Sequence, residues 1–167
     1  MLLGRDVDSA GRRRAIELNN LLFTSFLSKA AMSGGAQPGP RELNLVWDAS
    51  GSGAERDHAR EFALLNALFS AASEVRVNLT VARDTAEPTR SFDVRAGDWR
   101  ALRRTLEQLP YDGASSPAAW YAGLSAASSG NASLALLFSD GLATWPDLGA
   151  KPPAGPVFTV NAASRAD

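Results

Sequence analysis

The fold class of this 167-residue chain is indicated most clearly by the segment Leu43-Asn44-Leu45-Val46-Trp47-Asp48-Ala49-Ser50-Gly51-Ser52-Gly53. Residues 43–47 form a short, mostly apolar run, which is typical of a strand buried on both faces of a parallel sheet. The polar, glycine-rich residues 48–53 predict a turn, and the segment from about 55 to 72 predicts a helix. A buried strand that leads through a tight loop into a helix begins a βαβ unit.

The chain continues this alternation of strands and helices after residue 72. The strands are predicted at 75–81, 89–95, 133–138 and 156–160. The helices are predicted at 99–109, with Asp98 as its cap, and at 117 to about 127, with Ser116 as its cap. Because only a few turn-forming residues separate the strands at 75–81 and 89–95, we expect them to form an antiparallel edge hairpin. We therefore predict an α/β fold with a doubly wound, mainly parallel sheet flanked by helices, in a Rossmann-like arrangement.

A separate element precedes this alternation. Apolar residues recur near helical spacing between residues 10 and 32, which predicts a helix. Gly34-Gly35 and Pro38-Gly39-Pro40 end that helix and indicate a linker. We therefore divide the chain into an N-terminal helix with its linker, residues 1–40, and a main domain, residues 41–167.

The composition excludes several classes of partner. The formal net charge is -1 and the pI about 5.8, so charge gives no reason to expect nucleic acid as a partner. No apolar run reaches the roughly 18 residues of a spanning helix, so we expect no membrane insertion. Three arginines at 12–14 precede the apolar segment 21–27, but polar residues interrupt this resemblance to a signal peptide. We expect a cytoplasmic location, with a periplasmic or secreted one as the alternative.

The absence of some side chains limits the metal chemistry. The chain has no cysteine and a single histidine, His58. Thiolate zinc sites and motifs with two histidines are therefore excluded. Any metal must be held mainly by oxygen, which favours magnesium, manganese or calcium.

Oxygen-bearing side chains follow two of the predicted strands and occupy one further loop. Asp48, Ser50 and Ser52 follow the strand at 43–47, and Asp140 follows the strand at 133–138. Residues 111–117, between two predicted helices, contribute further hydroxyls. Ligands of open α/β sheets bind beyond the carboxyl ends of the strands, where these loops converge. If the hydroxyls bind a cation directly and the carboxylates bind it through water, an acidic group of a partner would complete its coordination shell.

Two of these motifs resemble those of von Willebrand factor A (vWA) domains. Asp48-Ala49-Ser50-Gly51-Ser52 is similar to the D-x-S-x-S loop of their metal-ion-dependent adhesion site (MIDAS), and Phe138-Ser139-Asp140-Gly141 resembles their third motif. Ser115 stands where the family has a threonine, and Ser116 is the alternative. Over residues 42–162 the chain looks most like bacterial vWA domains that accompany inter-α-trypsin-inhibitor-type (VIT) domains.

The resemblance implies a non-catalytic module for metal-dependent protein–protein interaction. Its metal, magnesium or else manganese or calcium, would be held by Asp48, Ser50, Ser52, Ser115 and Asp140. A protein partner would offer an aspartate or glutamate to the metal. Two alternatives are a serine hydrolase that uses Ser52 or Ser50 with His58, and a degenerate vWA scaffold without metal. We predict that His58 is a surface helix residue, and no G-x-S-x-G motif supports the hydrolase.

The chain departs from the family at both ends. Residues 1–40 do not resemble a VIT domain, and the family adds a helix, a strand and a helix after the strand that corresponds to 156–160. Either the chain is a fragment that lacks this helix-strand-helix, or the N-terminal helix covers part of the same surface.

Overall fold

The computed structural model describes residues 41–72, 74–125, 133–145, 151 and 157–162. The predicted N-terminal helix and its linker lie outside these residues. The described elements are β1 (Glu42–Asp48), the 3-10 helix η2 (Gly51–Glu55), α2 (His58–Ala71), β2 (Glu74–Ala82), β3 (Arg90–Arg95), α3 (Arg100–Glu107), α4 (Pro117–Ser125), β4 (Ser133–Phe138) and β5 (Val157–Val160).

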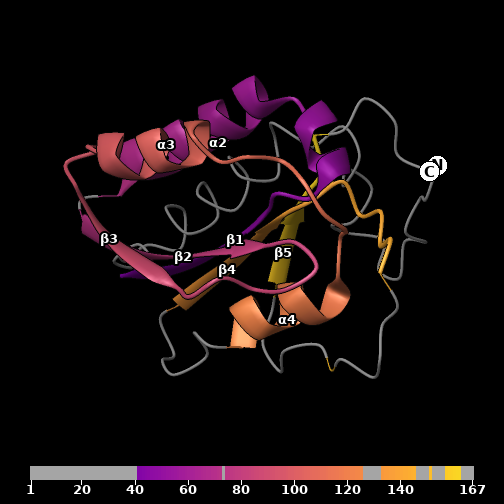
Figure 1. Ribbon diagram of the computed structural model, residues 1–167. Helices are drawn as coiled ribbons and strands as arrows, with labels where there is room; N and C mark the ends of the chain where they lie inside the picture. The colour runs from indigo at the N-terminus through magenta and orange to yellow at the C-terminus, as the bar shows by residue number, and fades with distance from the viewer. Residues whose placement is uncertain (1–40, 73, 126–132, 146–150, 152–156, 163–167) are drawn as a thin grey trace, which may run out of the picture.

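Five strands form one sheet in the order β3-β2-β1-β4-β5 (Figure 1). β1 pairs in parallel with β2 and with β4, and β4 pairs in parallel with β5. β2 and β3 are antiparallel and form the predicted edge hairpin. After β1 the chain forms β2 and β3 on one side of that strand, and it then forms β4 and β5 on the other side. The direction in which strands are added therefore reverses at β1. The gap between the carboxyl ends of β1 and β4 is thus a topological switch point, where ligands of this fold class bind.

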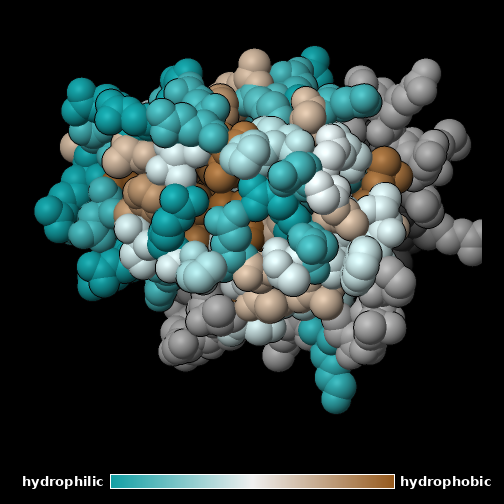
Figure 2. Space-filling model, viewed as in Figure 1, coloured by the Kyte–Doolittle hydropathy of each residue, from teal (hydrophilic) through white to brown (hydrophobic). Residues whose placement is uncertain are grey.

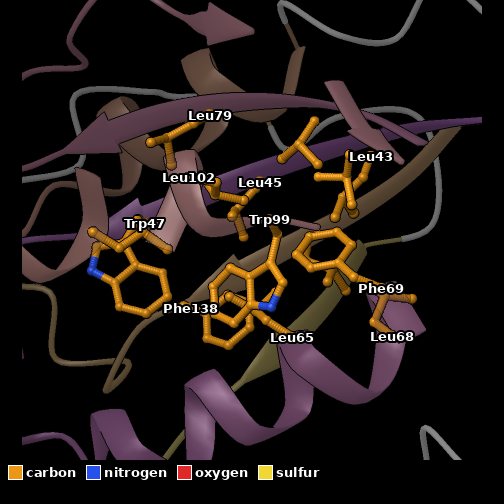
Figure 3. Close-up of a cluster of buried hydrophobic side chains, with 14 of the residues drawn as sticks. Leu43, Leu45, Trp47, Leu65, Leu68, Phe69, Leu79, Trp99, Leu102 and Phe138 are labelled. Carbon is orange, nitrogen blue, oxygen red and sulfur yellow. The ribbon is translucent and has the colours of Figure 1, made fainter. Parts of the chain in front are cut away.

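Helices cover both faces of the sheet, which confirms the predicted doubly wound arrangement. Figure 1 shows α2 and α3 on one face and α4 on the other. The side chains of β1 alternate between the two: Leu45 and Trp47 belong to the larger core under α2 and α3, and Val46 belongs to the smaller core under α4. Figure 3 shows Trp47 close to Phe138 within the larger core, and their ring centroids are 5.0 Å apart. Hydrophilic side chains cover the outer side of α3 and the β3 edge (Figure 2).

α4 lies directly on the sheet because it carries a glycine at the point of contact. Gly123 is buried, and a Cβ built there would be 2.9 Å from Cγ2 of Thr80 and 2.9 Å from Cγ2 of Val46. Any larger residue would therefore push the helix away from β1 and β2. This close approach positions the amino end of α4, and with it the loop before Pro117, near the carboxyl end of β1.

Two helices begin later than predicted, α2 by three residues and α3 by one. The helix predicted from about residue 55 begins at His58, because Asp57 is its N-cap and accepts a 3.1 Å hydrogen bond from the Arg60 amide. Residues 51–55 form the 3-10 helix instead. α3 begins at Arg100, and the carboxylate of Asp98 accepts a 3.2 Å hydrogen bond from the amide of that residue.

Candidate functional site

The carboxylate of Asp48 is the centre of a hydrogen-bonded cluster at the switch point. Asp48 is the last residue of β1 and is 0% exposed. Its Oδ1 accepts a 3.0 Å hydrogen bond from the Ser50 amide. Its Oδ2 accepts hydrogen bonds from the hydroxyls of Ser115, at 2.8 Å, and Ser139, at 2.7 Å. Groups from three loops that are distant in sequence therefore meet on one buried carboxylate, as the sequence predicts for these loops.

The loop after β1 brings two serine hydroxyls together. Oγ of Ser50 and Oγ of Ser52 are 3.3 Å apart. Ser50 is buried and has an extended backbone, and the 3-10 helix that follows turns the chain back so that the Gly53 amide donates to the Ser50 carbonyl at 2.9 Å. A hydrogen bond from the Gly51 amide to the Gly113 carbonyl, at 3.1 Å, ties this loop to the loop before α4. The loops are thus connected through backbone as well as side chains.

The two adjacent serines before α4 have different partners. The hydroxyl of Ser115 donates to Asp48, whereas the hydroxyl of Ser116 accepts a 3.4 Å hydrogen bond from the Ala119 amide and caps α4. The Ser115 carbonyl accepts hydrogen bonds from the amides of Thr144 and Trp145, both at 3.0 Å. Ser115 is therefore held by the loop after β4 as well as by β1.

Asp140 is near this cluster through its neighbour in the chain. It is 6% exposed, and its Oδ1 accepts a 3.0 Å hydrogen bond from the Leu142 amide. Its connection to Asp48 passes through Ser139, whose hydroxyl donates to Asp48 and accepts a 3.0 Å hydrogen bond from the Gly141 amide. The structure thus joins Asp48, Ser50, Ser52 and Ser115 by hydrogen bonds, and the carboxylate of Asp140 bonds within its own loop.

Ser139 also belongs to this cluster, although the sequence motif indicates its neighbour Asp140 as the ligand and not Ser139. The available signal was its position, since a hydroxyl directly after a buried parallel strand lies at the ligand-binding edge of the sheet.

A buried group of charged residues lies behind the Asp48 loop and was also missed. Arg56 is 4% exposed; its Nε donates to Oε1 of Glu61 at 2.7 Å and its Nη1 donates to the Asp48 carbonyl at 2.6 Å. Nδ1 of His58 is 2.8 Å from Oε2 of Glu61. In sequence these residues look like the solvated first turn of a helix, so only their burial distinguishes them.

His58, which we predict as a surface residue of a helix, is only partly exposed. It is the first residue of α2, and its side chain is 25% exposed. Its ring centroid is 5.9 Å from that of Trp47 and 4.9 Å from that of Tyr111. Burial raises the pKa of Tyr111, whose hydroxyl accepts a 2.9 Å hydrogen bond from Nε1 of Trp47. The imidazole therefore packs against aromatic rings under the Asp48 loop and keeps part of its surface in contact with solvent.

The donors at this site suit an oxygen-coordinated cation. In the part of the chain that the structure describes, no group of three or more histidine, cysteine, aspartate and glutamate side chains could hold a metal. A cation at the switch point would therefore depend on hydroxyls and the carboxylates of Asp48 and Asp140. Adjacent oxygens of an octahedral magnesium shell are about 2.9 Å apart, close to the 3.3 Å between the hydroxyls of Ser50 and Ser52.

A surface pocket lies at the opposite end of the strands from the Asp48 cluster. It is lined by residues of α2, the turn between β3 and α3, and the first turn of α3: Asn66, Ala96, Gly97, Asp98, Trp99, Arg100 and Arg103. Arg95 at the end of β3 pairs with Glu74 at the start of β2, so the turn after β3 lies at the amino end of β2. The Asp48 cluster lies at the carboxyl ends of the parallel strands, so the pocket is far from it. Its carboxylate, Asp98, is already paired with Arg100. We therefore place the candidate site at the switch point.

No helix among the described residues has the length and hydropathy needed to cross a membrane. Comparison with protein-family models, with curated proteins and with solved structures found no match to this chain.

Proposed function

We propose that this chain is a vWA-type module for metal-dependent protein–protein interaction. In this proposal Asp48, Ser50, Ser52, Ser115 and Asp140 hold a divalent cation, magnesium or else manganese or calcium. The observation that carries the proposal is the convergence on Asp48, where Oδ2 accepts hydroxyls from Ser115 and Ser139 and Oδ1 accepts the Ser50 amide. Such a centre presents hard oxygen donors from three loops at the ligand-binding edge of the sheet.

The chemistry of the donors supports a binding role for the cation. Serine hydroxyls are neutral ligands, so they leave much of the positive charge of a bound cation uncompensated. An octahedral shell has about six positions, and the protein supplies five side chains, of which the carboxylates can act through water. A position therefore remains for an outside ligand, and an aspartate or glutamate of a protein partner has the charge and oxygen donors to fill it.

The position of His58 gives no support to a serine hydrolase. Such an enzyme needs the imidazole within hydrogen-bond reach of its serine. The hydrogen bond of His58 Nδ1 is with Glu61, and in the described part of the chain Nε2 is buried without a hydrogen-bond partner. Neither ring nitrogen is therefore bonded to Ser50 or Ser52. We accordingly propose binding rather than hydrolysis.

Thermal unfolding with and without metal tests the proposal. Wild-type protein is melted in EDTA and in increasing Mg²⁺, Mn²⁺ or Ca²⁺. A cation that binds only the folded state stabilises it by about 2.7 kcal/mol at 100 times its Kd. We expect a concentration-dependent rise of Tm for wild type and none for Asp48→Ala. Absence of a shift in wild type with all three cations contradicts the proposal.

Two further variants make the experiment specific. Asp112→Ala removes a carboxylate that is 71% exposed in the loop before α4 and pairs with Arg83 rather than with the cluster, so it should keep the metal response. Ser52→Ala removes a half-buried hydroxyl and should weaken the response even if Asp48→Ala does not fold. Partner capture should then require the cation, and EDTA and Asp48→Ala should each abolish it.

A further inference from the structure

The ion pair of Arg56 and Glu61 lies directly behind the loop that carries the proposed metal ligands. Both side chains are 0% exposed, and Nε of Arg56 is 2.7 Å from Oε1 of Glu61. The same guanidinium donates through Nη1 to the carbonyl of Asp48 at 2.6 Å. The pair therefore connects the first turn of α2 to the backbone of the residue whose carboxylate centres the cluster.

The loop is shaped to admit this guanidinium. A Cβ built on Gly53 would be 2.8 Å from Nη1 of Arg56 and 2.9 Å from the carbonyl oxygen of Asp48. A side chain at position 53 would thus occupy the space through which Arg56 reaches Asp48. The guanidinium carbon is also 5.2 Å from the ring centroid of Trp47, so an aromatic face supports it from the side.

Stability alone is a weak reason for this arrangement. Two buried charges lose their hydration, and replacing a buried ion pair by apolar residues of similar size is often neutral or stabilising. An arginine beside a cation site would also repel the cation. Glu61 offsets that repulsion, and its second carboxylate oxygen is 2.8 Å from Nδ1 of His58, which fixes the orientation of the carboxylate. The charges of Arg56 and Glu61 therefore cancel, and what remains specific to the pair is the hydrogen bond from Arg56 to the Asp48 carbonyl.

We propose that Arg56 is a positioning residue of the metal site. Its guanidinium, oriented by Glu61, holds the Asp48 carbonyl so that residues 48–52 keep the conformation in which their side chains meet. Glu61 also cancels the charge of Arg56 next to the cation. This inference rests on the proposed metal-binding function and names the residues that prepare the loop before the cation arrives.

Positioning and electrostatics make opposite predictions for Arg56→Met. If the arginine acted only through its charge, its removal would reduce repulsion and the cation would bind more tightly. If it positions the loop, its removal weakens binding although a positive charge has been lost. Arg60→Met is the matched control, because Arg60 is an exposed arginine of α2 that pairs with Asp57.

The experiment measures Mn²⁺ affinity of the full chain by calorimetry, at a temperature where every variant is folded. We expect Arg56→Met to weaken binding about tenfold or more, Arg56→Lys to restore part of the loss, and Arg60→Met to match wild type. Gly53→Ala keeps both charges but places a methyl group against Nη1 of Arg56 and the Asp48 carbonyl, where the two meet, so it should also weaken binding. Gly53→Ala tests the inference even if Arg56→Met does not fold.

A second readout needs no metal. In metal-free protein, exchange of the Ser50 and Gly53 amide hydrogens should be faster in Arg56→Met than in wild type and unchanged in Arg60→Met. If Asp48→Ala abolishes Mn²⁺ binding while Arg56→Met and Gly53→Ala both bind as tightly as wild type, the inference is wrong and the proposed function stands. If wild type binds none of Mn²⁺, Mg²⁺ and Ca²⁺, both are wrong.

Discussion

The hydroxyl of Ser115 donates a 2.8 Å hydrogen bond to Oδ2 of Asp48, although 67 positions separate the two residues in the chain. This bond connects the loop before α4 to the end of β1 at the switch point. Ser116, the residue after Ser115, instead accepts a hydrogen bond from the first turn of α4 and caps that helix. The pair of serines therefore separates two roles, one in the site and one in helix stability.

Ser115→Ala and Ser116→Ala should differ in their response to metal. A hydrogen bond to a charged group contributes about 1.5–3 kcal/mol, so Ser115→Ala should destabilise the metal-free protein and also weaken its stabilisation by Mg²⁺. Ser116→Ala removes a helix cap, which costs about 1 kcal/mol, and should leave the metal response unchanged. Urea unfolding with and without Mg²⁺ measures both effects. The opposite assignment would follow if Ser116→Ala alone lost the response.

Ser139→Ala should destabilise the fold even without metal. Its hydroxyl donates to Asp48 and accepts from the Gly141 amide, and the residue is 0% exposed. Removing it leaves a buried carboxylate with one partner fewer, which costs about 1–3 kcal/mol. Urea unfolding of metal-free protein checks this. Ser91→Ala, an exposed serine of β3 that also bonds to a side chain, is the control and should change stability by less than about 0.5 kcal/mol.

Gly123→Ala should reverse the usual helix preference. Inside a helix, alanine normally stabilises by about 1 kcal/mol relative to glycine. Here the new methyl group would meet Thr80 and Val46 at 2.9 Å, and such overpacking costs about 1–3 kcal/mol. We expect a lower urea midpoint than wild type. Ala122→Ser, at the exposed neighbouring position of α4, should have little effect, and a stabilised Gly123→Ala would contradict the close packing of α4 on the sheet.

The turn before α3 should show a local pH dependence. The side-chain hydrogen bond from Arg100, with its backbone hydrogen bond, lowers the pKa of Asp98 from 3.8 to about 2. A lowered folded-state pKa means that the stabilisation is complete above pH 3.8 and is lost as the pH falls through about 2. A carboxyl NMR titration should give this low pKa, and Arg100→Ala should return it towards 3.8. A normal pKa in wild type would contradict the observed pairing.

Local sequence was sufficient for the main elements of the fold. The apolar run at 43–47 and the alternation at 75–81 identify β1 and β2, because burial on two faces or on one imposes a characteristic spacing of apolar side chains. The hairpin of β2 with β3 followed from their short connection. The loops with candidate donors were found in the same way, since parallel strands direct their carboxyl ends to one edge.

Three-dimensional packing decided which side chains take part. The sequence offers both Ser115 and Ser116 as ligands and Ser116 also as the cap of the helix that begins at Pro117, and the packing of α4 on the sheet brings the hydroxyl of Ser115 to Asp48. His58 and Arg56 have the composition of a solvated first turn, yet Arg56 lies against the ring of Trp47, and His58 packs against Trp47 and Tyr111. Patterns within a few residues report the periodicity of burial. Hydrogen bonds between residues tens of positions apart depend instead on how whole helices and strands pack against one another, and the local sequence pattern does not determine that packing.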